Sequence, residues 1–346
     1  MSDPDILIRI EGRAGRITLN RPKALNAVTW DMIRAIDEAL GKWEMDDRVD
    51  LVVIDAAGDR AFAAGGDIVD LYETGKAGDF EFGRRFWAEE YRLNARIKFY
   101  PKPYVALMHG FVMGGGVGIS CHGSHRIVDE TAQIAMPECG IGLIPDVGGS
   151  WLLANAPQSF GAFIGLTGYR MSASDAVFAG FADSFVPRAN WPALIRDLTE
   201  TGDVASIKTH EATTLPDSML MIWPETSRWF AGATIDNIID TLEHVGAENA
   251  DKHLKTLRRQ SPLSIACGFS AIRAASTMDL HEALAQEYRY VWRCMEHGDF
   301  LEGIRAQVID KDRSPAWRHD NVEAVSDAQV DAMLAPLGEN ELTFET

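Results

Sequence analysis

The stretch YVALMHGFVMGGGVGIS, residues 104–120, passes without a break from an apolar segment into a cluster of glycines. Glycine costs backbone entropy wherever it is ordered, so four glycines in five positions indicate that something must approach this backbone closely. A strand that ends in a glycine turn and opens a helix leaves free backbone N–H groups at that turn. Such a turn can hold a developing oxyanion. The glycines are Gly114, Gly115, Gly116 and Gly118.

The common glycine motifs do not fit this cluster. A dinucleotide-binding fingerprint starting at Gly114 would need glycine at Ile119, and the Walker pattern lacks its GK[ST] ending. A nucleophile elbow centred on Ser120 would need glycine at position 122, which is His122. His122 and His125 can share a helical face, but no third ligand is spaced to complete a metal site. We therefore expect neither a phosphate loop, nor a serine nucleophile, nor a metal.

Composition and charge narrow the class of protein. The chain has 346 residues, 46% of them hydrophobic, and a formal net charge of -18, which disfavours nucleic acid as a partner. An anionic small ligand would need a local cationic patch. No apolar run approaches the roughly 18 to 20 residues that a membrane helix needs, so we expect no membrane partner. The acidic start MSDPDILIRI does not resemble a transit peptide, which predicts a cytoplasmic location, and the spacing of the four cysteines predicts reduced thiols.

Strand and helix signals alternate over the first half of the chain. The segments RITLN (16–20), DLVVIDA (50–56) and PYVALMH (103–109) are of the buried-strand type. Thr29 can cap a helix with one apolar face between the first two. Strands separated by helices predict crossover connections on a mostly parallel sheet, and hence an α/β fold.

Two further regions depart from this alternation. Residues 70–100 are charged and aromatic and predict an inserted helical cover. After about residue 200 the strand pattern fades, and segments such as DLHEALAQEYRYVWRCMEHG (279–298) predict amphipathic helices. We therefore expect an α/β core over 1–200 and a helical C-terminal region over 201–346.

A second small-residue segment completes a pattern that is typical of one superfamily. RAFAAGGDIVDLY (60–72) presents small residues directly after the strand at 50–56, where a second oxyanion donor is needed. With LNRPKALNAVTWDMI (19–33) and MPECGIGLIPDVGG (136–149), the two glycine segments resemble the crotonase, or enoyl-CoA hydratase/isomerase, superfamily. The resemblance implies a crotonase-like fold of ββα units with the inserted helix and the helical C-terminal region, and makes residues 1–200 an acyl-CoA-binding core. It also implies that the N–H groups of Gly66 and Gly115 hold a thioester oxygen, and that the Ala64 carbonyl lies near the adenine of coenzyme A.

The carboxylates indicate which reaction within the superfamily. Enoyl-CoA hydratases carry a glutamate just after the glycine turn, where this chain has Gly118. Their second glutamate matches Glu138, and Asp146 follows eight residues later, a pairing that resembles 3-hydroxyisobutyryl-CoA hydrolases. Glu90 in AEEY matches a substrate-contacting glutamate of that subfamily. The segment EYRYVWRCMEHGDFLEGIRAQVIDKDRSPAW (287–317) matches its C-terminal signature, and the resemblance extends from about residue 6 to 325.

The resemblance implies hydrolysis of a short 3-hydroxyacyl-CoA, most directly 3-hydroxyisobutyryl-CoA in valine catabolism. Glu138 can act as a general base on water or attack the carbonyl to form a mixed anhydride, and the sequence does not choose between these routes. Asp146 would orient the substrate hydroxyl or the water. It also precedes an expected helix at 147–155 and can be its N-cap; both roles can hold together. Arg21 and Lys23 fall where the superfamily places the nucleotide end of its ligand, or are solvated surface charges.

Two other functions stay open. An enoyl-CoA isomerase needs the same oxyanion hole with a lone glutamate, which Glu138 alone supplies. A non-catalytic acyl-CoA-binding protein can retain the fold without the activity. In each case coenzyme A arrives as part of the ligand, so no separate cofactor is expected. Superfamily members often form trimers or hexamers, so a homo-oligomer is compatible with the resemblance.

Overall fold

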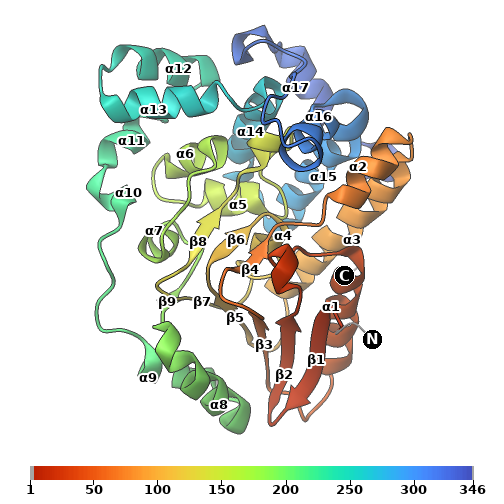
Figure 1. The fold of residues 1–346 in the computed structure, drawn as a ribbon, viewed down its shortest axis with the longest axis vertical. Helices are drawn as coiled ribbons and strands as arrows, with labels where there is room; N and C mark the ends of the chain where they lie inside the picture. The colour runs from red at the N-terminus through yellow and green to blue at the C-terminus, as the bar shows by residue number, and fades with distance from the viewer. Residues whose placement is uncertain (1–3, 345–346) are drawn as a thin grey trace. The chain divides into compact units, whose positions relative to one another are not determined.

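The computed structural model describes residues 4–344 (Figure 1). Contacts along the backbone divide the chain into two units. Each unit draws on three separate stretches of the chain. The first unit contains residues up to Gly66, with Arg92–Ile134 and Met171–Met221. The second contains Asp67–Tyr91, Ala135–Arg170 and the chain from Ile222 onward. The expected division near residue 200 stays a prediction about folding units.

The first unit is built on a six-stranded sheet in the order β1-β2-β3-β5-β7-β9. Only β1 is antiparallel to its neighbour, while the other pairs are parallel, so the predicted α/β fold with a mostly parallel sheet is confirmed. The predicted strands lie within one or two residues of those found. The strands are β1 (Ile6–Glu11), β2 (Ala14–Leu19), β3 (Leu51–Ala56), β5 (Tyr104–Met108), β7 (His125–Val128) and β9 (Ser184–Phe185).

The central strands of the large sheet are buried on both faces. On one face, alternate residues of these strands pack against α8 (Trp191–Thr201), as period-two strand geometry allows. On another part of the unit, Thr29 caps α1 (Trp30–Trp43) by accepting a hydrogen bond from the Met32 N–H, as predicted. Short helices α7 (Ala173–Phe178) and α9 (Ile207–His210) complete the unit.

A small three-stranded sheet carries the glycine-rich segments. Its order is β4 (Ala61–Ala64), β6 (Phe111–Met113) and β8 (Gln133–Ala135). Strands β4 and β6 are parallel, with Ala64 opposite Met113. The chain leaves β6 through Gly114 directly into the one-turn helix α4 (Gly115–Gly118). The strand, glycine turn and helix expected from the sequence are therefore present.

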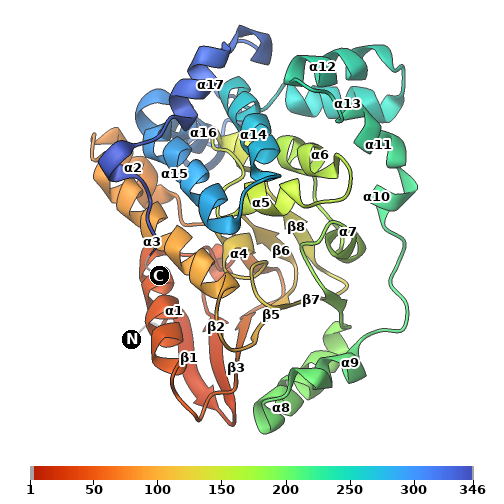
Figure 2. The same ribbon diagram turned by 180° about the vertical axis from the view of Figure 1, so that it is seen from behind.

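The second unit is helical. The predicted inserted cover consists of α2 (Val69–Lys76) and α3 (Phe80–Lys98), and α3 continues into the first unit after Tyr91. Among the described residues no strand follows β9, which confirms the helical character of the region after residue 200. Helices α14 (Pro262–Ala275) and α15 (Leu280–His297) pack against α5 (Gly149–Ala154) (Figures 1 and 2). Helix α10 (Met219–Ile222) lies at the boundary, with only its last residue in this unit. The other helices of the unit are α6 (Phe160–Thr167), α11 (Pro224–Trp229), α12 (Ile235–His244), α13 (Glu248–Leu257), α16 (Phe300–Ile304) and α17 (Asp327–Leu334).

The cysteines and the helix lengths bear on two expectations from the sequence. All four cysteines are free and buried, as the expectation of reduced thiols requires. Within residues 4–344, none of the helices combines the length and the apolar character needed to cross a membrane.

Candidate active site

The proposed oxyanion donors follow the ends of two neighbouring strands in the first unit. Because Ala64 of β4 pairs with Met113 of β6, Gly66 and Gly115 each lie two residues beyond a matched pair. Parallel strands end at the same edge of their sheet, so the two glycines occupy neighbouring positions at one edge. The preceding residues adopt backbone angles that favour glycine: φ is +110° at Gly65 and +46° at Gly114.

The N–H groups of Gly66 and Gly115 are free to bind a ligand oxygen. Within residues 4–344, neither group donates a hydrogen bond to another backbone or side-chain acceptor. Gly115 is the first residue of α4, where an α-helix leaves its N–H groups unpaired. Gly116 has a different reason to be glycine, since a Cβ there would lie 2.5 Å from the Ala63 carbonyl oxygen. The glycine cluster thus serves close helix-to-strand packing as well as free donors.

The segment proposed to meet the nucleotide is tied to β4. The buried Asn26 side chain donates to the carbonyls of Ala57 and Ala61, and the Ala64 N–H donates to the Leu25 carbonyl at 3.0 Å. Lys23 is exposed in the short turn Pro22–Ala24. The Arg21 side chain instead donates to the Ala27 carbonyl and lies 3.3 Å from the Asp5 carboxylate. Lys23 is therefore the freer of these two cations to meet an anion.

The structure brings the three predicted carboxylates together in the second unit. Glu138 begins a 3-10 turn (Glu138–Ile141), Asp146 lies in the turn before α5, and Glu90 lies on α3. Each is at least 96% buried, and the charge of Asp146 acts on both glutamates. Carboxylates are seldom buried without cationic partners, because their desolvation is costly. This cluster is therefore a candidate for function rather than for stability.

Two oxygens of the cluster have no donor. Within the described part of the chain, the buried Oε1 of Glu90 and Oε2 of Glu138 make no hydrogen bond. Most buried side-chain polar atoms in folded proteins have a partner, so two orphaned acceptors in one cluster need an explanation. A substrate hydroxyl or a water molecule would supply the missing donors.

Burial raises the pKa values of all three carboxyl groups, and the Asp146 charge adds to the rise at the two glutamates. Burial first, and then the Asp146 charge, hold the pKa of Glu138 and of Glu90 well above the usual range. Burial also raises the pKa of Asp146 to about 7, although the hydrogen bond from Tyr91 opposes the rise. Like charges this close in a buried site favour shared protons over three ionised groups. The cluster therefore keeps its protons to higher pH than ordinary carboxyl groups do.

The structure contradicts one alternative for Asp146. Helix α5 begins at Gly149, its N-cap is Gly148, and no side chain caps it. The interpretation of Asp146 as an N-cap is therefore wrong. Its side chain instead accepts a hydrogen bond from the Tyr91 hydroxyl, which lies 2.9 Å from Oδ2.

Sequence reasoning missed two residues beside Asp146. Tyr91 follows Glu90 in the chain and donates to Asp146, and burial holds the pKa of its phenol well above 10, so it stays a donor. Glu287 on α15 accepts hydrogen bonds from the turn that carries Asp146. Both residues were visible in the motifs AEEY and EYRYVW. Their partners were not, because no sequence pattern states which segments meet.

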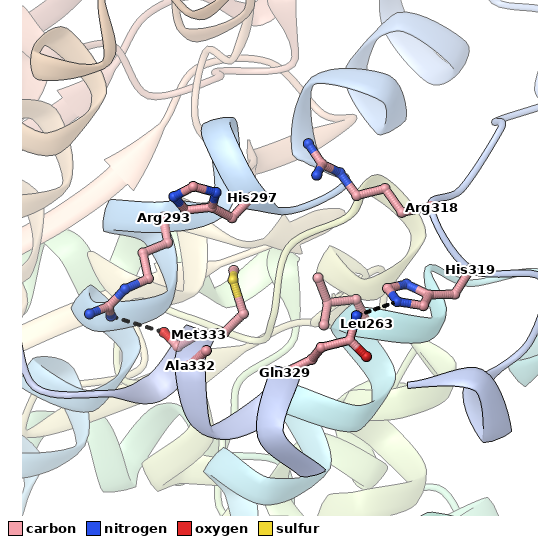
Figure 3. Close-up of a pocket in the computed structure, with 8 residues that line it drawn as sticks. All are labelled: Leu263, Arg293, His297, Arg318, His319, Gln329, Ala332 and Met333. Atoms are coloured by element: carbon pink, nitrogen blue, oxygen red, sulfur yellow. Dashed lines mark hydrogen bonds between the residues drawn. The ribbon is translucent and has the colours of Figure 1, made fainter. Parts of the chain in front are cut away.

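A separate cavity of about 700 Å³ in the second unit contains none of these carboxylates. Figure 3 shows Arg293 and His297 of α15 on one side of it, and Arg318 and His319 on the other. The Arg293 side chain donates to the carbonyls of Met333 and Ala335 and so ties the end of α17 to α15. The polar groups of this cavity hold helices together, and the cavity is distinct from the carboxylate cluster.

Comparison with known proteins identifies the family. Residues 14–334 match the family model described as enoyl-CoA hydratase/isomerase. The chain belongs to the enoyl-CoA hydratase/isomerase family. This family assignment confirms the crotonase superfamily expected from the motifs, and full-length relatives named for 3-hydroxyisobutyryl-CoA hydrolase confirm the subfamily.

Members of the family differ in the activities for which they are named. A curated relative from Danio rerio, named 3-hydroxyisobutyryl-CoA hydrolase, mitochondrial, is 41% identical over 98% of this chain and 91% of its own length. A crystal structure described as an enoyl-CoA hydratase from Rhodobacter sphaeroides 2.4.1 is 53% identical, with a TM-score of 0.95, and covers 99% of this chain and 100% of its own. A structure described as a carnitinyl-CoA dehydratase from Mycobacterium thermoresistibile is 41% identical, with a TM-score of 0.93 and 99% coverage of both chains. The crotonase-like fold is thereby confirmed, and the reaction must be argued from the residues.

Proposed function

We propose that this protein hydrolyses the thioester of a short 3-hydroxyacyl-CoA, most directly 3-hydroxyisobutyryl-CoA, to the 3-hydroxy acid and coenzyme A. The observation that carries the proposal is the buried cluster of Glu90, Glu138 and Asp146 with two unpartnered oxygens. Curated relatives that match nearly the whole chain bear the name of this hydrolase. Three carboxylates also exceed the single carboxylate that an isomerase needs.

The free N–H groups of Gly66 and Gly115 hold the thioester oxygen. Attack on the carbonyl carbon moves negative charge onto that oxygen, and preset backbone donors stabilise the charge with little reorganisation. Water supplies the hydroxyl group that ends on the acyl carbon. The carbon–sulfur bond breaks, and the coenzyme A thiolate takes up a proton as it leaves.

Glu138 is the group that activates water or attacks the carbonyl. Its raised pKa makes its carboxylate a stronger base than an ordinary glutamate, which suits proton abstraction from water. In the nucleophilic route, a carboxylate oxygen of Glu138 attacks the carbonyl carbon and forms a mixed anhydride, which water then opens. Both routes need Glu138 in its ionised form.

Asp146 and Glu90 bind the 3-hydroxyl group. The Tyr91 hydroxyl donates to Oδ2 of Asp146 and fixes its carboxyl group, and Glu90 has an orphaned oxygen. A substrate hydroxyl that donates to these acceptors relieves the cost of burying them. An acyl chain without the hydroxyl leaves that cost in place.

The nucleotide end of the substrate is placed by resemblance. The Ala64 carbonyl lies near the adenine, and Lys23 meets a phosphate, with Arg21 holding the turn by its own contacts. Coenzyme A is part of the substrate, and no further cofactor is needed. A place in valine catabolism, a cytoplasmic location and a homo-oligomeric assembly belong to this proposal; the curated relatives carry the word mitochondrial in their names.

Hydration of an enoyl-CoA is the second candidate, because a closely similar solved structure is described by that activity. The position that carries a hydratase glutamate is Gly118, which is buried in α4 and has no side chain. Glu138 would then have to act without that partner. Gly118 therefore favours hydrolysis over hydration.

The test follows free thiol with a colorimetric reagent and enoyl absorbance in parallel. Each of 3-hydroxyisobutyryl-CoA, 3-hydroxypropionyl-CoA, isobutyryl-CoA and crotonyl-CoA is offered to the purified protein. Thiol release from the two hydroxylated thioesters, with no loss of crotonyl absorbance, supports the hydrolase. Loss of crotonyl absorbance without thiol release would assign a hydratase, and binding without either change would assign a non-catalytic binder.

A further inference from the structure

The turn that carries Asp146 has an unfavourable backbone. Val147 and Gly148, the next two residues, both lie in the left-handed region, with φ of +53° and +78°. Left-handed backbone is disfavoured for a β-branched residue such as valine and persists only where the surroundings hold it. The position of the Asp146 side chain thus depends on whatever holds this turn.

The carboxylate of Glu287 holds the turn. Its Oε2 accepts a hydrogen bond from the Gly148 N–H at 2.7 Å, and its Oε1 accepts one from the Ser150 N–H at 2.9 Å. The Ser150 hydroxyl donates to the same Oε1. Backbone N–H groups that converge after left-handed residues form an anion-binding nest, here at the start of α5. Glu287 fills this nest from 137 residues further along the chain.

Glu287 is itself firmly placed. It is fully buried on α15, whose first turn is fixed by a capping box between Asp279 and Glu282. The adjacent Gln286 donates to the Ala271 carbonyl of α14, which ties α15 to that helix. A rigid element therefore presents the carboxylate, as accurate positioning requires.

We propose that Glu287 is a positioning residue that sets the place of Asp146 by holding the 146–150 turn. The proposal rests on the proposed hydrolase function and adds the C-terminal helix α15 to the machinery of the site. Glu287 touches neither substrate nor reacting atoms in this account. It acts through the backbone of Gly148 and Ser150.

The charge of Glu287 supplies a signature that a purely structural role lacks. Burial raises the pKa of Glu287 to about 8, which the bonds from Ser150 and Gly148 oppose and the Asp146 charge reinforces. In turn, the Glu287 charge adds to burial and to Asp146 in raising the pKa of Glu138, and it acts on Tyr91 as well. Because its pKa is about 8, Glu287 gains this charge only as the pH rises through about 8, and Glu287→Gln cannot gain it. The inflection near pH 8 that this charge adds to the pH–rate profile is therefore absent from the variant.

Glu287→Gln is the decisive variant. The amide has nearly the shape of the carboxylate, but its NH₂ group faces one of the N–H donors, so the turn must shift. A displacement of about 1 Å near the chemistry costs on the order of 100-fold in rate. We expect kcat on 3-hydroxyisobutyryl-CoA to fall about 100-fold, KM to change little, and the inflection of the pH–rate profile near pH 8 to disappear.

Gln286→Ala is the matched control on the same buried stretch of α15. It removes the bond to the Ala271 carbonyl and leaves the nest intact, so we expect a lower Tm with wild-type kcat and pH profile. Ser150→Ala removes one of the three donors and decides the matter if Glu287→Gln does not fold. Several-fold lower kcat at unchanged KM in Ser150→Ala supports the proposal, and an unchanged kcat overturns it.

Hydrogen exchange of the 146–150 peptide separates this proposal from the proposed function. Faster exchange in Glu287→Gln, but not in Gln286→Ala, shows that Glu287 holds the turn whatever the activity is. A wild-type protein that releases no thiol would refute the hydrolase alone. A Glu287→Gln variant with wild-type kcat, pH profile and exchange would overturn the positioning role while leaving the hydrolase intact.

Discussion

The glycine segments of the first unit and the carboxylate cluster of the second prepare for chemistry in opposite ways. The first offers backbone N–H donors whose spacing is set by the register of two parallel strands, β4 and β6. The second offers side-chain acceptors from separate segments, buried at a cost and left without donors. The donors need only two glycine turns at the ends of neighbouring strands, whereas the acceptors depend on several helical segments that bury them.

The largest expected effect comes from removing a carboxylate of the buried cluster. Glu138→Gln removes the group that either hydrolytic route needs, so turnover should fall below detection while coenzyme A still binds. Thiol release and calorimetric titration with coenzyme A measure the two properties. Glu248→Gln, on the exposed surface of α13, is the control and should match wild type. Near wild-type hydrolysis by Glu138→Gln would refute the mechanism.

A smaller effect should follow from removing one of the two proposed backbone N–H donors. Gly115→Pro removes one N–H group from the proposed pair and strains the turn before α4. Loss of one oxyanion donor typically costs about 100-fold to 1,000-fold in kcat. Circular dichroism and the Tm establish whether the variant is folded. A folded Gly115→Pro variant that keeps its rate would place the oxyanion hole on other residues.

The smallest effect concerns the free energy of unfolding and measures what it costs to bury the carboxylate of Asp146. The folded pKa of Asp146 is about 7, against an ordinary value of 3.8, so the folded protein holds a proton that the unfolded chain releases first. Stability should therefore fall as pH rises from about 4 to 7, by at most roughly 4 kcal/mol for this group. The amide of the Asp146→Asn variant cannot ionise, so the stability of this variant should decrease less over the same pH range. Urea unfolding at pH 5 and pH 8 measures the free energy of unfolding of both proteins. An equal decrease from pH 5 to pH 8 in wild type and in Asp146→Asn would contradict this prediction.

The sequence predicted local features better than it predicted partners. Strand and cap signals located the parallel sheet and the helix after Thr29, because alternation and capping act over a few residues. The motifs also selected Glu90, Glu138 and Asp146, which the structure brings together. The cap interpretation of Asp146 was wrong because two left-handed residues delay the start of α5 to Gly149.

What escaped the sequence depends on contacts between distant segments. Tyr91 bonds Asp146 across 55 positions, and Glu287 bonds Ser150 across 137. Neither a tyrosine nor a glutamate indicates by its type which distant segment it contacts. Gly116 was assigned to close ligand approach with its neighbours, whereas its near contact is the Ala63 carbonyl of β4. These cases share one cause, since each is decided by packing and not by local pattern.

We propose above all that the carboxylate cluster binds the 3-hydroxyl group of a thioester substrate and so selects for it. The most direct test measures kcat/KM for 3-hydroxyisobutyryl-CoA, 3-hydroxypropionyl-CoA and isobutyryl-CoA, on wild type and on Asp146→Ala. Sites built to bond a hydroxyl reject the deoxy analogue by roughly 10,000-fold, whereas one methyl group is worth only about 10-fold to 200-fold. The account predicts that the two hydroxylated thioesters differ modestly, that both greatly exceed isobutyryl-CoA, and that Asp146→Ala narrows the gap. Equal kcat/KM on hydroxylated and deoxy thioesters in wild type would contradict it and indicate a general short-chain acyl-CoA thioesterase.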